Sequence, residues 1–151
     1  MADFYPYLIS SLPMLNFGMK PPFLKSSFLR LCSEFIPDSD SDILRDLPES
    51  DDYAKKTFRH PITGKWVVFD VALRNALAKA RASRKHIDAT VYLRPGQEEG
   101  VFFEQIAQQA VRTPSVVEAE KLLDEARWKK LEELSTGHYF DVGFLITYFY
   151  K

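Results

Sequence analysis

Apolar residues recur at helical spacing over residues 65–85, and this pattern constrains the fold more than any other feature of the chain. Steps of three and four residues place side chains on one face of an α-helix. Lys and Arg gather toward the end of the segment, where positive charge interacts favourably with the helix dipole. The pattern predicts a helix of about five turns. Its buried face would consist of Trp66, Phe69, Leu73, Ala76, Leu77 and Ala80.

Four further segments have the character of helices. They are residues 28–35, 38–46, 101–111 and 116–134. The second opens with acids, which are favoured in the first turn of a helix. Gly137 ends the helix predicted over residues 116–134, and Thr113 and Ser115 are alternative N-caps for that helix.

The C-terminal segment 139–148 is ambiguous by composition, because its β-branched and aromatic residues would also suit a strand. Phe140, Phe144 and Tyr148 recur at four-residue steps, which favours a helix that starts near Asp141.

Together the segments predict an all-α fold, a bundle of roughly six to eight helices with antiparallel helix hairpins. We expect one helical domain over residues 1–151, with a mobile linker over the polar, turn-rich residues 48–64. The apolar run at the C-terminus stops abruptly at Lys151. We therefore expect the chain to be the N-terminal part of a longer helical protein.

The composition excludes several classes of protein. Hydrophobic residues make up 46% of the 151 residues, so global disorder is not expected. The net charge of -1 gives no general attraction for nucleic acid or anionic lipid. The single Cys32 fits a reducing cytoplasm. The opening lacks a basic signal-peptide segment, and the apolar runs are shorter than the roughly 20 residues of a membrane span. We expect a cytoplasmic protein without direct membrane insertion.

The acids of residues 38–49 match the spacing of a calcium-binding loop. The carboxylates at template positions 1, 3, 5, 9 and 12 are those of Asp38, Asp40, Asp42, Asp46 and Glu49. The template needs Gly at position 6, where the backbone has positive φ, and this chain has Ile43. The favoured interpretation is therefore an acidic helix start with solvated charges, and a metal site is the weak alternative.

A basic cluster ends the helix predicted over residues 65–85. Its members are Arg74, Lys79, Arg81, Arg84, Lys85 and His86. A solvated helix end is the favoured interpretation. The alternative is a docking surface for an acidic partner, with Arg74, Arg81, Arg84 and Lys85 as the candidates. No aromatic residues are interleaved for base stacking, so no nucleic-acid partner is expected.

No arrangement of residues indicates catalysis. The three histidines His60, His86 and His138 lack the spacing of metal ligands. Cys32 lies among apolar helix positions and is interpreted as a small core residue. We expect no enzymatic activity and no cofactor.

Aromatic residues exceed what a core of this size hides. Two explanations stay open: some of them form a partner interface, where Tyr and Phe are enriched, or a further part of the protein covers them. The candidates for partner binding are Tyr5, Tyr7, Phe140, Phe144 and Tyr148.

The chain resembles a family of uncharacterised bacterial proteins encoded beside the subunits of V-type (A/V-type) ATPases. Three segments carry the resemblance. They are the opening Y-x-Y-L-I-S-S-L-P-M-L-x-F-G-x-K-P-P-F, the segment E-A-E-K-L-L-D-E-x-R-W over residues 118–128, and H-x-F-D-x-x-F-L-I-x-Y over residues 138–148.

The resemblance implies a non-catalytic subunit or assembly factor, similar in outline to the C (or d) subunit. That subunit is the helical funnel that joins the central rotor shaft to the membrane ring. The implied partners are the central stalk and the membrane ring, and the implied location is cytoplasmic, peripheral to the inner membrane. Two alternatives remain: a helical adaptor for another protein partner, and a calcium-binding module at residues 38–49.

Overall fold

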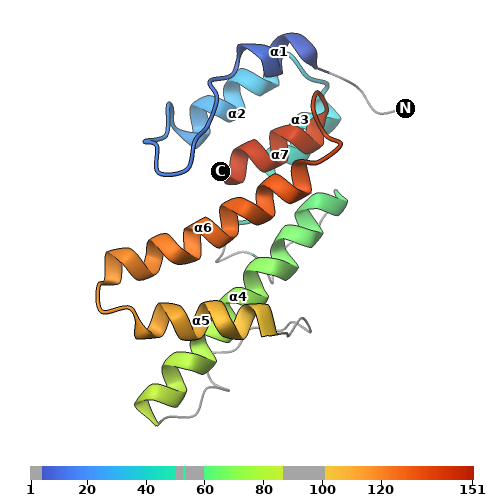
Figure 1. The fold of residues 1–151 in the computed structure, drawn as a ribbon. Helices are drawn as coiled ribbons and strands as arrows, with labels where there is room; N and C mark the ends of the chain where they lie inside the picture. The colour runs from blue at the N-terminus through green and yellow to red at the C-terminus, as the bar shows by residue number, and fades with distance from the viewer. Residues whose placement is uncertain (1–4, 50–52, 54–59, 87–100) are drawn as a thin grey trace. The chain divides into compact units, whose positions relative to one another are not determined.

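The computed structural model describes residues 5–49, 53, 60–86 and 101–151 (Figure 1). Seven helices make up the regular structure of these residues, which contain no strand. The all-α prediction is therefore confirmed. The chain divides into two compact units: unit 1 consists of Met1–Gly64 and Leu131–Lys151, and unit 2 consists of Lys65–Lys130. The expectation of one domain stays a prediction.

Unit 1 is built around four short helices. They are α1 (Pro6–Ser11), α2 (Lys25–Ser33), α3 (Asp38–Arg45) and α7 (Val142–Tyr150). Helix α3 packs against both α2 and α7. Their apolar residues meet in one core, whose most buried side chains are Leu8, Phe28, Cys32, Leu44, Leu145 and Ile146. Burial of this apolar surface is the main source of stability for helices too short to persist alone.

Hydrogen bonds from two tyrosines of α7 join distant parts of the chain within unit 1. The hydroxyl of Tyr148 donates to the carbonyl of Pro13 at 2.7 Å, and that of Tyr150 donates to the carbonyl of Pro48 at 2.8 Å. Each of these partly buried hydroxyls thus has a hydrogen-bond partner. These bonds fix α7 against segments from the first third of the chain.

Segment 139–148 is helical from Val142 onward, close to the start near Asp141 that its four-residue period predicted. The carboxylate of Asp141 accepts the backbone N–H of Phe144 at 3.2 Å and caps α7. Gly143 follows in the first turn, where a Cβ atom would lie 2.7 Å from Nδ1 of His138 and 2.9 Å from Cδ1 of Ile62. Only glycine fits this position without displacing a neighbour.

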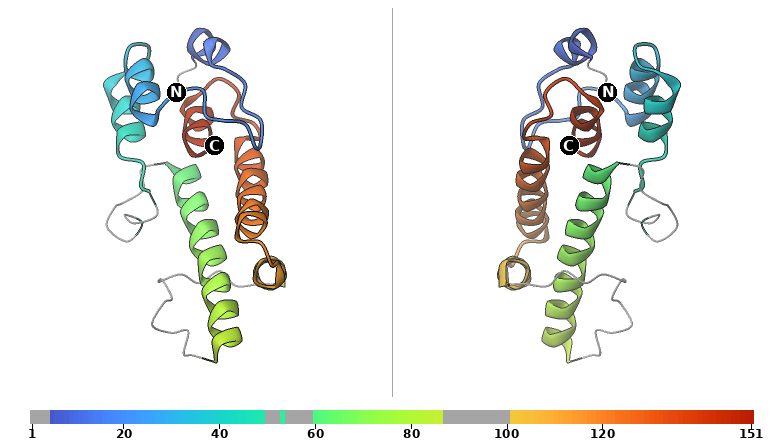
Figure 2. Two further views of the ribbon diagram at one scale, coloured as in Figure 1. Left: turned by 90° about the vertical axis from the view of Figure 1, so that its left-hand side faces the viewer. Right: turned by 90° about the vertical axis from the view of Figure 1, so that its right-hand side faces the viewer.

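Unit 2 consists of α5 (Val101–Arg112) and the greater parts of α4 (Pro61–Lys85) and α6 (Val116–Ser135). Helices α4 and α6 run antiparallel in this unit (Figure 2). Their ion pairs show the same direction: Asp70 pairs with Arg127, whereas Arg81, later in α4, pairs with Glu120, earlier in α6. The aromatic rings of Phe69 in α4 and Phe103 in α5 pack with their centroids 5.4 Å apart. The unit's buried apolar residues include Leu73, Ala107 and Leu123.

The linker predicted over residues 48–64 is wrong at both of its ends. Pro48 is buried and accepts the bond from Tyr150. Residues 61–64 form the first turn of α4. Proline is suited to the first helical position, because the backbone N–H that it lacks would have no partner within the helix there. Residues 50–52 and 54–59 of the linker lie outside the described part of the chain.

The rival caps of α6 are resolved in favour of Ser115. Its Oγ accepts the backbone N–H of Glu118 at 3.4 Å. The hydroxyl of Thr113 donates instead to the carbonyl of Gln109, at 2.8 Å in the last turn of α5.

Candidate functional site

The acids of the calcium template lie on a helix rather than in a loop. Asp38 and Asp40 occupy the first turn of α3, as the favoured interpretation predicted. Side chains two residues apart on a helix point about 160° apart, so the carboxylates of Asp38 and Asp40 do not converge. Template acids are engaged within the protein: Asp40 accepts from Tyr5, Asp42 lies 3.7 Å from Arg45, and Glu49 lies 3.1 Å from Lys25. The calcium loop is therefore wrong, and no group of side chains in the described residues could hold a metal ion.

Arg74 belongs to a buried ion network rather than to a docking surface. Asp70, whose side chain is 2% exposed, accepts from Nε of Arg74 at 3.0 Å and from Nε of Arg127 at 2.9 Å. Arg127 also donates to Asp124 at 2.9 Å. Burial acts to lower the pKa of Arg127, and the charge of Asp70 and its hydrogen bond outweigh this effect, so the pKa is raised. The network holds α4 against α6.

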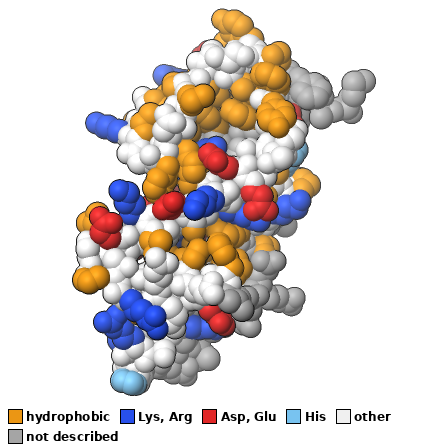
Figure 3. All heavy atoms as spheres, in the orientation of Figure 1, with side chains coloured by type: hydrophobic (Ala, Val, Ile, Leu, Met, Phe, Trp, Pro, Cys, Tyr) orange, Lys and Arg blue, Asp and Glu red, His pale blue; other side chains and the backbone are white. Residues whose placement is uncertain are grey.

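The other basic candidates lie at the exposed end of α4. Arg81 forms an exposed ion pair with Glu120 at 3.8 Å, and Arg84 donates to the carbonyl of Val111. Lys85 is exposed in the last turn. Figure 3 shows Lys and Arg side chains gathered at this end of the molecule. The structure thus keeps three of the four basic candidates together.

Two of the aromatic candidates are part of the core of unit 1. Tyr5 is 7% exposed and donates to Asp40, and Tyr148 is 9% exposed and donates to Pro13. Burial raises the pKa of Tyr148. Phe144 is half-buried, with its ring centroid 6.2 Å from that of Tyr148. This burial argues against partner binding by Tyr5 and Tyr148.

Large apolar side chains of residues 7–35 are exposed in unit 1. We call them the N-terminal apolar surface: Tyr7, Met14, Phe17, Met19, Leu24 and Phe35. Tyr7 and Leu24 are each 74% exposed, and the rings of Tyr7 and Phe35 lie 5.6 Å apart. Figure 3 shows hydrophobic side chains gathered where α1 and α2 lie. Phe140 and Tyr139 of unit 1 are also exposed. Exposed apolar side chains that gather on one face make this surface a candidate for protein interaction.

A histidine pair that the sequence spacing did not reveal lies at the N-termini of α4 and α7. The ring centroids of His60 and His138 are 6.3 Å apart. Nδ1 of His60 accepts the backbone N–H of Ile62 at 3.2 Å, and Nδ1 of His138 lies 2.8 Å from a carboxylate oxygen of Asp141. Burial lowers the pKa of His60, and His138 lowers it further, while Asp141 and Asp40 oppose the shift. The neutral form of His60 is thus the one that caps α4.

Cys32 is buried in the core of unit 1. Its burial raises the pKa of the thiol to about 12, so the reactive thiolate is not formed at neutral pH. The interpretation of Cys32 as a small core residue fits its complete burial.

None of the helices in the described residues has the length and apolar character needed to cross a bilayer. Comparisons of the chain with protein-family models, curated proteins and solved structures find no match.

Proposed function

We propose that the chain is a non-catalytic helical subunit or assembly factor of a V-type ATPase, which contacts the central stalk and the membrane ring through protein–protein interfaces. The observation that carries the proposal is the N-terminal apolar surface. Tyr7, Met14 and Leu24 are each at least 74% exposed. Full burial of a side chain such as Leu or Met stabilises by about 1.5–3 kcal/mol, and this free energy becomes available when a partner covers the surface.

The resemblance to the ATPase-associated family supports the identity of the partner. Its opening segment contains Tyr7, Met14 and Phe17, which all belong to the N-terminal apolar surface. The opening segment therefore contains residues that are buried in the core of unit 1 and apolar residues that stay exposed outside this core. A coupling or assembly role needs such a surface and needs no catalytic group.

An affinity pull-down of the tagged chain from native membranes, followed by mass spectrometry, tests the proposal. We expect ATPase subunits in a fixed ratio with the wild-type chain. The double variant Tyr7→Ser, Leu24→Ser should lose them. Val116→Ser, Val117→Ser is the matched control, because these unit 2 residues are 78% and 74% exposed, and it should retain them.

Absence of ATPase subunits from the wild-type sample would refute the ATPase role. Equal recovery with both double variants would refute the role of the N-terminal apolar surface. Recovery of a different protein, with capture that weakens steeply with salt, would favour the adaptor role, because exposed charge contacts are screened.

A further inference from the structure

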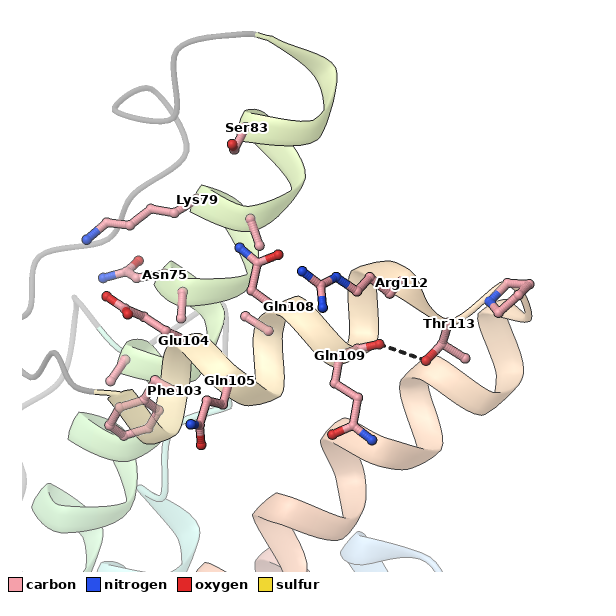
Figure 4. Close-up of a pocket in the computed structure, with 15 residues that line it drawn as sticks. Asn75, Lys79, Ser83, Phe103, Glu104, Gln105, Gln108, Gln109, Arg112 and Thr113 are labelled. Carbon is pink, nitrogen blue, oxygen red and sulfur yellow. Dashed lines mark hydrogen bonds between the residues drawn. The ribbon is translucent and has the colours of Figure 1, made fainter.

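Helix α4 takes part in both compact units. Its first turn, from Pro61 to Gly64, belongs to unit 1, and the helix belongs to unit 2 from Lys65 onward. In unit 2 its side chains lie beside those of α5, where Asn75 and Gln108 line one hollow (Figure 4). The contacts of the first turn therefore differ from those that hold the rest of the helix.

The first turn is buried in unit 1. Ile62 is 4% exposed and belongs to the core of this unit, where its side chain lies beside Gly143 of α7. Thr63 is 3% exposed, and within the described part of the chain its Oγ1 has no hydrogen-bond partner. A buried hydroxyl without a partner gains hydrogen bonds to water when the turn opens, so the burial of Thr63 favours opening. The turn is therefore held by the apolar contacts of Ile62 and by the hydrogen bonds at the start of the helix.

His60 supplies those hydrogen bonds as the N-cap of α4. Its carbonyl accepts the backbone N–H of Gly64 at 3.3 Å, and its Nδ1 accepts the backbone N–H of Ile62 at 3.2 Å. A neutral imidazole can accept at Nδ1, whereas a protonated imidazole carries N–H groups on both nitrogens and accepts at neither. Protonation of His60 therefore breaks the bond to Ile62 and places a donor against a donor.

The charges around His60 act on the same proton. A cation at the N-terminus of a helix is opposed by the helix dipole. The ring of His138 lies 6.3 Å away, and its charged form also disfavours protonation of His60. Asp141 and Asp40 favour protonation, but Asp141 already accepts from His138, and Asp40 accepts from Tyr5. Burial and His138 outweigh the two carboxylates, and the pKa of His60 is lowered.

We propose that protonation of His60 releases the first turn of α4 from the core of unit 1. The cap is lost, and Ile62 and Thr63 become accessible to water. The rest of α4 stays folded, because its contacts lie in unit 2. The start of this helix is thus an acid-sensitive switch within unit 1, and it does not depend on the ATPase role.

Amide hydrogen exchange of the full chain, followed by NMR, tests the proposal. Each measured rate is compared with the intrinsic rate at the same pH, which gives the protection of the amide. Below about pH 6.5 the open turn binds more protons than the closed turn, because the pKa of His60 is lowered only when the turn is closed. From about pH 7.5 to 5.0, protection of Ile62 and Gly64 should therefore fall by about fivefold, the typical effect of a lost N-cap. At both pH values Ile62 should be at least about tenfold less protected than Ile146 in α7, which exchanges when unit 1 unfolds.

Two substitutions at one position separate titration from capping. His60→Asn keeps a side-chain acceptor at the N-cap and does not titrate in this range, so protection of Ile62 should be the same at both pH values. His60→Ala removes the acceptor and should give low protection at both. His86→Gln, at an exposed histidine, is the control and should respond as the wild type does.

The wild type alone can overturn the proposal. Protection of Ile62 that does not change with pH would refute it. Equal protection of Ile62 and Ile146 would also refute it, because the turn would then open only when the whole unit unfolds. A fall of the same size in His60→Asn would show that another group titrates, and would exclude His60 as the switch.

Discussion

The ion network of unit 2 gives a stability prediction whose size follows from burial. Asp70 is almost fully buried between two guanidinium groups. Asp70→Asn keeps the shape of the side chain and removes its charge, which leaves Arg127 without its buried charge partner. Breaking a fully buried pair costs about 3–5 kcal/mol. Arg127 is 18% exposed, Arg74 is 35% exposed, and Arg127 keeps Asp124, so we expect a loss of about 2–3 kcal/mol.

Both tryptophans, Trp66 and Trp128, lie in unit 2, so their fluorescence reports on the unit that contains the network. Urea unfolding followed by this emission gives the free energy of unfolding. The expected loss corresponds to a fall of about 4–12 °C in Tm for a chain of this length. Glu125→Gln breaks the exposed pair with Lys129 and serves as the control, with an expected cost below about 0.5 kcal/mol.

A double variant separates the charge interaction from simple loss of packing. Asp70→Leu with Arg127→Met replaces the pair by apolar side chains, which is often neutral or stabilising for a buried pair. We expect it to be more stable than Asp70→Leu alone by at least about 1 kcal/mol. A loss below about 0.5 kcal/mol for Asp70→Asn, or additive effects in the double variant, would refute the reasoning.

Four further predictions concern unit 1. Gly143→Ala should destabilise by about 1–3 kcal/mol in thermal or urea unfolding, because the new Cβ clashes with two side chains; a variant as stable as the wild type would contradict this contact. The thiol of Cys32 should resist labelling by a disulfide reagent until urea unfolds the unit, and rapid labelling in native buffer would contradict its burial. Because the pKa of His60 is lowered on folding, the unfolded state binds more protons than the folded state as the pH falls below about 6.5, and the free energy of unfolding should decline there. His60→Asn should flatten this decline, and His86→Gln, at an exposed histidine, should not. Identical pH profiles for the wild type and both variants would contradict the role of His60. Calcium at about 1 mM should leave Tm unchanged, in the wild type and in Asp42→Asn alike. A calcium-dependent rise in Tm of the wild type would contradict the conclusion that residues 38–49 do not bind calcium.

Local pattern predicted six of the seven helices in the described residues, because their apolar residues repeat at steps of three and four. It did not predict α1, which is only six residues long. The period of residues 65–85 identified most of α4, and the four-residue steps of Phe140, Phe144 and Tyr148 predicted a helix that starts near Asp141, where α7 begins. The start of α4 was missed because proline and glycine around residues 61–64 are typical of turns, and proline is also suited to the first turn of a helix.

Contacts between distant residues could not be inferred in the same way. The pairing of Asp70 with Arg127 depends on the packing of α4 and α6, and the approach of His60 to His138 depends on two helix N-termini that meet in unit 1. Tyr5 was a candidate for partner binding because the chain has more aromatic residues than a core of this size hides. Its contacts with Asp40 and Phe140 exist only after the core has formed.

Unit 1 is discontinuous in the chain, and this has a consequence for the order of synthesis. Leu145 and Ile146 of α7 are fully buried among side chains from the first half of the protein. As the ribosome produces the chain, the first 64 residues therefore have no complete core until α7 emerges, whereas unit 2 is a continuous segment and can close earlier. Nascent unit 1 thus exposes apolar surface until residues 131–151 are synthesised, and this is the stage at which a chaperone would have the most to bind.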